Sequence, residues 1–210
     1  MKKSFLVIAS FSCLTACVSS SVVGFRPNTL LHYQYQQFEI EYDPTVMQTT
    51  PAPRTFAQLE IVQEKAKVDE KNAYLMATLL FHHPNCVSAK KNKTQGCLPA
   101  LNAYQNVLKF KPDHPLALYQ MGVIYDFFLD KKDMRQAIYY YRKAADAGNF
   151  RACENLFGIY LNGNVVPQNI EEARYYAQKG AIFGSKQLRY YLEHWNVQIM
   201  PYLKALESEK

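Results

Sequence analysis

The stretch AIYYYRKAADAG, residues 137–148, decides the fold because it returns as ARYYAQKGAIFG at residues 173–184. The two stretches lie 36 residues apart and share alanine, tyrosine, lysine and glycine at matched positions. Each places tyrosines and small residues at the three- and four-residue spacing of a helix face. Each also ends on a glycine, which suits the left-handed residue that closes many helices. The chain therefore repeats one type of helix.

A second pair of matched stretches precedes these helices. ALYQMGVIY at residues 117–125 matches ACENLFGIY at residues 152–160, with a spacing of 35. Each unit is therefore predicted to be a helix, a turn and a second helix. Alanines let the two helices approach closely, and tyrosines and leucines fill the stripe between them. A single hairpin cannot bury that stripe, so an array of at least three stacked units is expected.

These residues resemble the Sel1-like repeats, which are close relatives of tetratricopeptide repeats. The second copy also keeps the loop NGNVVPQN at residues 162–169, whereas the first copy's loop, residues 126–133, lacks the Gly-Val-Pro element. Phe157 stands where the family pattern has a packing glycine. The resemblance implies an all-α fold, a right-handed α-solenoid of helix-turn-helix repeats, with two Sel1-like repeats in residues 113–184.

The flanking segments extend the array on both sides. ALNAYQNVLKFKP at residues 100–112 resembles the second helix and closing proline of a tetratricopeptide repeat. Its first helix is expected at about residues 70–83, after a leading helix at 56–68. Residues 56–112 would then form a leading helix and one tetratricopeptide-like unit. A helical cap is expected at residues 185–210, broken into two pieces at Pro201.

The N-terminus has the three parts of an export signal. Lys2 and Lys3 precede an apolar run from Phe5 to Leu14, and LTAC at residues 14–17 closes it. The segment resembles the signal peptide of a bacterial lipoprotein, which implies removal of residues 1–16 and a lipid on Cys17. The alternatives are an ordinary secretory signal cut within residues 19–21 and a short buried helix. The apolar run is shorter than the roughly 20 residues that span a bilayer.

The lipoprotein resemblance also implies a compartment. Lipoproteins that are retained at the inner membrane tend to have an aspartate after the lipidated cysteine, and this chain has Val18 there. The resemblance therefore points to a lipid-anchored protein on the periplasmic face of the outer membrane. Loss of the two signal lysines lowers the formal charge from +6 to +4, which is no footprint of nucleic-acid binding. Residues 17–55 are expected to be a linker with a possible short strand between residues 30 and 42. This segment acts either as a tether or as a strand that pairs with another protein's sheet.

The cysteines fit an oxidising compartment. Cys86 and Cys97 flank a polar loop and are expected to form a disulfide. The alternative is a metal site built from these cysteines with His82 and His83, which is disfavoured because no second pair of ligands at metal-binding spacing follows. Cys153 is expected to be a small buried hydrophobe. No cofactor and no metal is predicted.

No hydrolase, nucleotide-binding or metalloprotease motif occurs in the chain, so no catalytic residue is assigned and a non-catalytic scaffold is expected. Such arrays bind partners on the concave wall formed by the first helices of their repeats. A protein partner in the cell envelope, in assembly, secretion or pilus machinery, is the leading hypothesis. The alternative is a small-molecule or cell-wall (muropeptide or β-lactam) binding protein or hydrolase. The candidate outward-facing residues for the partner are Tyr119, Asp126, Arg151, Glu154 and Asn155.

Overall fold

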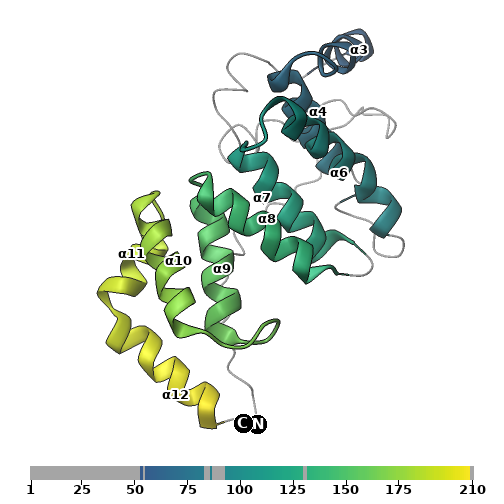
Figure 1. The fold of residues 1–210 in the computed structure, drawn as a ribbon. Helices are drawn as coiled ribbons and strands as arrows, with labels where there is room; N and C mark the ends of the chain where they lie inside the picture. Colours follow the sequence, from purple (N-terminus) through teal and green to yellow (C-terminus); the bar gives the residue numbers. More distant parts are fainter. Residues whose placement is uncertain (1–52, 54, 83–85, 87–92, 130–131, 209–210) are drawn as a thin grey trace, which may run out of the picture. The chain divides into compact units, whose positions relative to one another are not determined.

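The computed structural model describes residues 53, 55–82, 86, 93–129 and 132–208, and this part of the chain is helical, without a strand (Figure 1). The expected helical repeat fold, a solenoid of helix-turn-helix units, is confirmed. The signal segment, Cys17 and the possible strand between residues 30 and 42 lie outside the described residues. Among the helices described, none is both long and apolar enough to cross a membrane.

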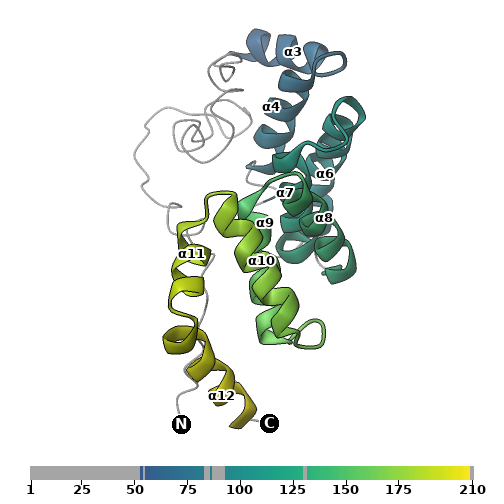
Figure 2. The ribbon, with the colours of Figure 1, turned by 60° about the vertical axis from the view of Figure 1, so that its left-hand side comes forward.

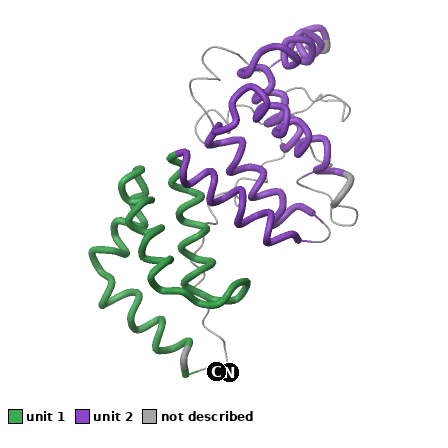
Figure 3. Tube along the Cα trace, in the orientation of Figure 1, with its two compact units in different colours: residues 1–23, 148–210 green, residues 24–147 purple. Residues whose placement is uncertain are grey.

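The described residues divide into two compact units, coloured separately in Figure 3. The N-terminal unit ends at Ala147 and the C-terminal unit begins at Gly148. The N-terminal unit contains α3 (Phe56–Lys65), α4 (Glu70–Phe81), α6 (Lys93–Phe110), α7 (Pro115–Val123), the π-helical turn η1 (Ile124–Phe128) and α8 (Met134–Asp146). The C-terminal unit contains α9 (Phe150–Asn162), α10 (Ile170–Ile182), α11 (Lys186–Glu193), the π-helical turn η2 (Trp195–Ile199) and α12 (Met200–Ser208).

The repeat helices begin and end at the residues that their caps predict. Asp133, Asn149 and Asn169 each accept a hydrogen bond from the backbone N–H three residues later, at 3.0–3.1 Å. After α8 and α10 the chain turns at Gly148 (φ +92°) and Gly184 (φ +107°), as predicted. α7 therefore pairs with α8, and α9 pairs with α10.

The first helix pair is longer than the sequence indicates. α4 covers the expected first helix and packs against α6, as Figures 1 and 2 show. α6 begins at Lys93, seven residues before the expected start, and it contains Pro99. Cys97 therefore lies within a helix and not at the end of a loop. The disulfide from Cys86 to Cys97 ties the chain that follows α4 to the first part of α6, with 4.4 Å between the two Cα atoms.

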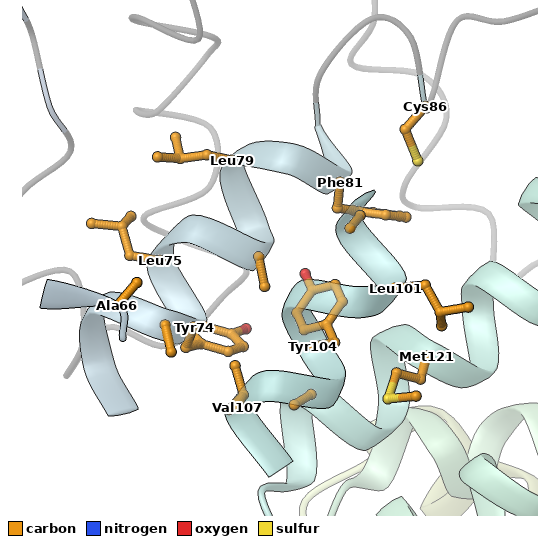
Figure 4. Packing of buried hydrophobic residues seen from close by; sticks show 14 of the residues in the cluster. Ala66, Tyr74, Leu75, Leu79, Phe81, Cys86, Leu101, Tyr104, Val107 and Met121 are labelled. Atoms are coloured by element: carbon orange, nitrogen blue, oxygen red, sulfur yellow. The ribbon is translucent and has the colours of Figure 1, made fainter. Parts of the chain in front are cut away.

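An apolar core lies between α4, α6 and α7 in the N-terminal unit (Figure 4). Tyr74 and Tyr104 are fully buried in it, with ring centroids 6.1 Å apart and planes at 56°. Phe81 completes the aromatic contacts, 6.5 Å from the ring of Tyr104. Aromatic side chains bury large apolar areas, so this cluster holds α4 against α6.

The two repeats solve the same packing problem in opposite ways. In the first repeat, Gly122 of α7 lies directly against the ring of Tyr141 in α8. The matched positions in the second repeat are Phe157 and Ala177, and both are buried. Phe157 is accommodated by the aromatic side chains of the C-terminal cap. Its ring stacks on Tyr191 at 5.7 Å and meets Trp195 edge-on at 6.4 Å.

The C-terminal cap consists of α11, η2 and α12. α11 ends at Glu193, and η2 follows with Trp195 and Ile199 buried. The helical cap is interrupted at His194 and not at Pro201, because η2 continues directly into α12, which contains Pro201 in its first turn. The hydroxyl of Tyr202 donates to Asn162 Oδ1 at 2.7 Å, which fixes α12 to the end of α9.

Candidate functional site

A polar stripe runs along α9 in the C-terminal unit. Arg151, Glu154 and Asn155 occupy positions i, i+3 and i+4, so they share one face of the helix, and all three are half-buried. The opposite face of α9 is apolar and buried against the rest of the unit. These three residues are among those that the sequence predicts to face outward, and their contact with a partner stays a prediction. The stripe gives α9 a surface with a guanidinium, a carboxylate and an amide next to one another.

Glu154 is the most constrained residue of the stripe. Its Oε1 accepts a hydrogen bond from Ser185 Oγ at 2.5 Å, and Ser185 Oγ in turn accepts one from the backbone N–H of Leu188 at 3.1 Å. Partial burial raises the pKa of Glu154, while the Ser185 hydrogen bond and the Arg151 charge oppose the rise. Glu154 thus links α9 to the start of α11 and faces the stripe with a fixed orientation.

Gly158 continues the stripe by one further turn. A Cβ atom at this position would meet nothing within 4 Å, so packing among the residues that the structure describes does not require glycine here. Glycine in a helix costs roughly 0.5–1 kcal/mol relative to alanine. The bare backbone of Gly158 therefore leaves open space beside Glu154 and Asn155.

In the N-terminal unit, Tyr119 and Asp126 occupy different surroundings. Tyr119 is half-buried on α7, and its ring lies 6.0 Å from that of Tyr141. Asp126, by contrast, is 8% exposed, and the prediction of an outward position is wrong for this residue. The repeat match explains why: Asp126 corresponds to Leu161, which is a core residue of the second repeat.

The carboxylate of Asp126 has two partners inside the N-terminal unit. The hydroxyl of Tyr141 donates to Oδ2 at 3.3 Å, and the ammonium of Lys132 lies 4.0 Å from Oδ1. Burial raises the pKa of Asp126, and the Lys132 charge and the Tyr141 hydrogen bond partly offset that rise. Asp126 therefore ties η1 to α8, and its side chain is not available to a partner.

The tyrosines of the repeats divide into packing and surface groups. Tyr125 stacks on Tyr140 at 5.6 Å, and Tyr160 stacks on Tyr176 at 5.8 Å, so these four join the two helices of each repeat, as predicted. Tyr139 and Tyr175 are half-exposed instead. The ammonium of Lys143 lies 5.4 Å from the ring of Tyr139, and that of Lys179 lies 5.5 Å from Tyr175. These two pairs of an exposed tyrosine and a lysine were not predicted from the sequence, although both recur at the 36-residue spacing.

The cysteine region carries no metal cluster within the described residues, where no three ligand-type side chains come together. Cys86 and Cys97 are joined by the disulfide, and His83 lies outside the described part of the chain. Burial lowers the pKa of His82 to about 3, so its ring is neutral at physiological pH. Cys153 is buried, as expected.

Comparisons with known proteins agree with the repeat boundaries. The model of the Sel1 repeat family matches residues 115–149 and 151–182, which are the pairs α7–α8 and α9–α10. One similar solved structure is a Sel1 repeat protein from Oxalobacter formigenes, at 25% identity and a TM-score of 0.47. The similarity covers 63% of this chain and 98% of that one. A search of curated proteins found no match to this chain.

Proposed function

We propose that this protein, which contains two segments matching the Sel1 repeat, is a non-catalytic adaptor that binds a protein partner through the first helices of its repeats. Sel1-repeat proteins generally mediate contacts between proteins, which supports a scaffold role. The surface that supports this function best is the stripe of Arg151, Glu154, Asn155 and Gly158 on α9. Tyr119 offers a second contact on α7, in the other unit.

The observation that carries the proposal is Gly158. A helix retains a glycine at a cost to stability, and no atom of the described chain needs the space that it leaves. A partner backbone could approach α9 closely at this point, as glycine permits elsewhere. The open space lies within one turn of Glu154 and Asn155, so polar groups and close approach coincide on the same face.

The chemistry of the stripe fits a polypeptide with both charges or with exposed backbone groups. Arg151 supplies donors, Glu154 supplies an acceptor, and the Asn155 amide supplies both. Glu154 is already oriented by Ser185, so a partner would not have to order it. A surface of this type suits an extended segment or a helix of another protein.

We further propose that the adaptor works in the bacterial cell envelope, at the periplasmic face of the outer membrane, with Cys17 as its lipid anchor. The support is the sequence LTAC at residues 14–17 behind a basic and apolar leader. Labelling of cells with radioactive palmitate tests the anchor. The parent protein should take up the label and fractionate with membranes, whereas Cys17→Ser should lose both properties. Unchanged labelling of Cys17→Ser would refute the anchor and leave the partner surface untouched.

Crosslinking in cells tests the partner surface. A photoreactive amino acid placed at position 155 should give a discrete protein adduct, to be identified by mass spectrometry. The same group at position 135, an exposed site on α8, serves as the control. Gly158→Gln should suppress the adduct by filling the open space. The proposal fails if position 155 gives no adduct beyond that of position 135, or if Gly158→Gln leaves the adduct unchanged.

A further inference from the structure

The turn between α10 and α11 exposes two successive apolar side chains. Ile182, the last residue of α10, is 80% exposed, and Phe183, which follows it, is 38% exposed. Gly184 then reverses the chain with φ +107°, and a Cβ there would meet nothing within 4 Å. The glycine is therefore required by the backbone of the turn. The Phe183 ring lies beside the turn at Gly148, 3.9 Å from where a Cβ of residue 148 would be, whereas no contact of the turn requires an isoleucine at residue 182.

The first repeat shows that this fold does not need apolar residues at the turn. The positions matching Ile182 and Phe183 are Asp146 and Ala147, followed by Gly148 in the same left-handed conformation. Asp146 is exposed. Both turns join helices of the same type, yet only the second presents an apolar tip. The apolar pair is thus a property of this turn and not of the repeat.

Basic residues surround the apolar tip. Residues 173–192 contain four basic residues and no acidic one. Lys186 opens α11 and is exposed, and Arg189 Nη2 donates to the backbone carbonyl of Ala181 at 3.2 Å, which holds its guanidinium beside the turn. Lys179 lies one turn before Ile182 on α10. Both helices that meet at the tip therefore carry basic residues beside it, and the Glu154 carboxylate of α9, which accepts from Ser185, is the acidic group that the structure places at this turn.

Two tyrosines lie further along the same helices. Tyr175 on α10 and Tyr190 on α11 are both half-exposed. On either side of Gly184 the exposed side chains are therefore first apolar or basic and then, further along each helix, a tyrosine with its polar hydroxyl. Apolar, basic and tyrosine side chains in combination are typical of segments that lie in a membrane interface.

We propose that the α10–α11 turn docks on an anionic lipid surface. Ile182 and Phe183 enter the boundary between headgroups and acyl chains, while Lys179, Lys186 and Arg189 bind lipid phosphates. An acidic protein would satisfy the three cations equally well, but the exposed Ile182 favours a lipid surface. This contact goes beyond the adaptor function and does not require a lipid on Cys17.

Vesicle co-sedimentation of the full chain tests the proposal. The vesicles contain either phosphatidylglycerol and phosphatidylcholine in equal parts or phosphatidylcholine alone. Ile182→Asp combined with Phe183→Ala gives this turn the residues that the first repeat has at Asp146 and Ala147, so the fold should tolerate the double variant. We expect this double variant to bind the anionic vesicles about tenfold more weakly than the parent. The control is Val197→Asp, at a side chain that is 69% exposed in η2, which should bind as the parent does.

Charge removal provides an independent arm that does not alter the apolar tip. Lys186→Gln with Arg189→Gln should weaken binding to anionic vesicles by about fivefold for each cation removed. It should leave binding to pure phosphatidylcholine unchanged. The residues of the leader are common to every variant, so the differences between variants report on the turn. Equal melting temperatures will show that the variants remain folded.

Three results would overturn the proposal. The first is equal sedimentation of the parent and the Ile182→Asp, Phe183→Ala variant, and the second is equal binding of the parent to both kinds of vesicle. The third is the formation of protein adducts alone by a photoreactive group at position 182 in cells, which would mean that the turn docks on a protein. A phospholipid adduct from the same position would support the lipid contact. Crosslinking from position 155 in the Ile182→Asp, Phe183→Ala variant separates this failure from failure of the adaptor function, because α9 is unchanged.

Discussion

Gly122 of α7 and Tyr141 of α8 lie so close that no side chain fits at residue 122: a Cβ atom there would be 2.5 Å from Tyr141 Cδ1. The pair sets the approach of the two helices in the first repeat. In the second repeat the large residue is on the first helix and the small one on the second. The matched positions of the two repeats thus carry the large and the small residue in opposite order.

Exchange of the two sizes should cost less stability than the two single changes cost in sum. Gly122→Ala should lower the free energy of unfolding by about 1–3 kcal/mol through overpacking. Tyr141→Ala should lower it by about 3–5 kcal/mol, because it leaves a cavity. The double variant Gly122→Phe, Tyr141→Ala copies the residues of the second repeat. Its loss in free energy of unfolding should be smaller than the sum of the losses caused by Gly122→Phe and by Tyr141→Ala. Urea denaturation measures this coupling, and strict additivity would show that the two residues do not share one space.

Gly158 and Gly180 should respond to alanine in opposite directions. Gly158→Ala should raise the free energy of unfolding by roughly 0.5–1 kcal/mol, because the helix gains and nothing is displaced. Gly180→Ala should lower it by about 1–3 kcal/mol, since its Cβ would lie 2.3 Å from Leu188 Cδ1 and 2.8 Å from Cys153 Cβ. Thermal denaturation followed by circular dichroism distinguishes the two. A fall in stability for Gly158→Ala would mean that the site is more crowded than it is in the structure.

The disulfide should contribute to stability by closing a short loop. The two cysteines are 11 residues apart, and Cys86→Ser with Cys97→Ser should reduce the free energy of unfolding by about 2–3 kcal/mol. A reductant should lower the melting temperature of the parent and leave that of the double variant unchanged. An equal response of both proteins would contradict a stabilising disulfide.

Asp126 should make stability depend on pH. Its pKa in the folded protein is above the ordinary value of 3.8, so the folded state holds the proton more tightly than the unfolded chain does. As pH rises from about the ordinary value through the folded pKa, the carboxyl ionises inside the protein and stability falls. Asp126→Asn should therefore have a higher melting temperature than the parent at neutral pH.

The advantage of Asp126→Asn should shrink as pH falls and disappear where the carboxyl is protonated in both states. Asp113→Asn, at an exposed aspartate, removes the same charge and serves as the control. A constant difference between Asp126→Asn and the parent at every pH would exclude titration of Asp126 as the cause.

The repeats and their ends could be predicted from sequence because the signals are local and occur twice. Gly148 and Gly184 each follow a helix with the same spacing of tyrosine and alanine, and both have the left-handed conformation expected of them. The start of α6 at Lys93 had no comparable signal. The expected start at residue 100 rested on the match to a tetratricopeptide helix, whereas the helix already contains Cys97 and Pro99.

The surface was harder to predict than the core, because an aspartate or a tyrosine can occupy either. Asp126 was expected to face outward by the resemblance to Sel1-like repeats, whereas its match to Leu161 within this chain indicated a buried position. Tyr139 and Tyr140 are neighbours of the same type, and only the stacking of Tyr140 on Tyr125 shows which one joins the helices. Exposure at these positions depends on contacts between helices, and a single chain position does not reveal them.

The opposite placement of large and small residues also limits recombination between the duplicated segments. A chimaera that joins α7 to the sequence of α10 would set Gly122 beside Ala177 and leave a void. The reciprocal chimaera would force Phe157 against Tyr141. The helices of the two hairpins are therefore not interchangeable one by one, so protein engineers who lengthen or shuffle this array would have to move whole hairpins.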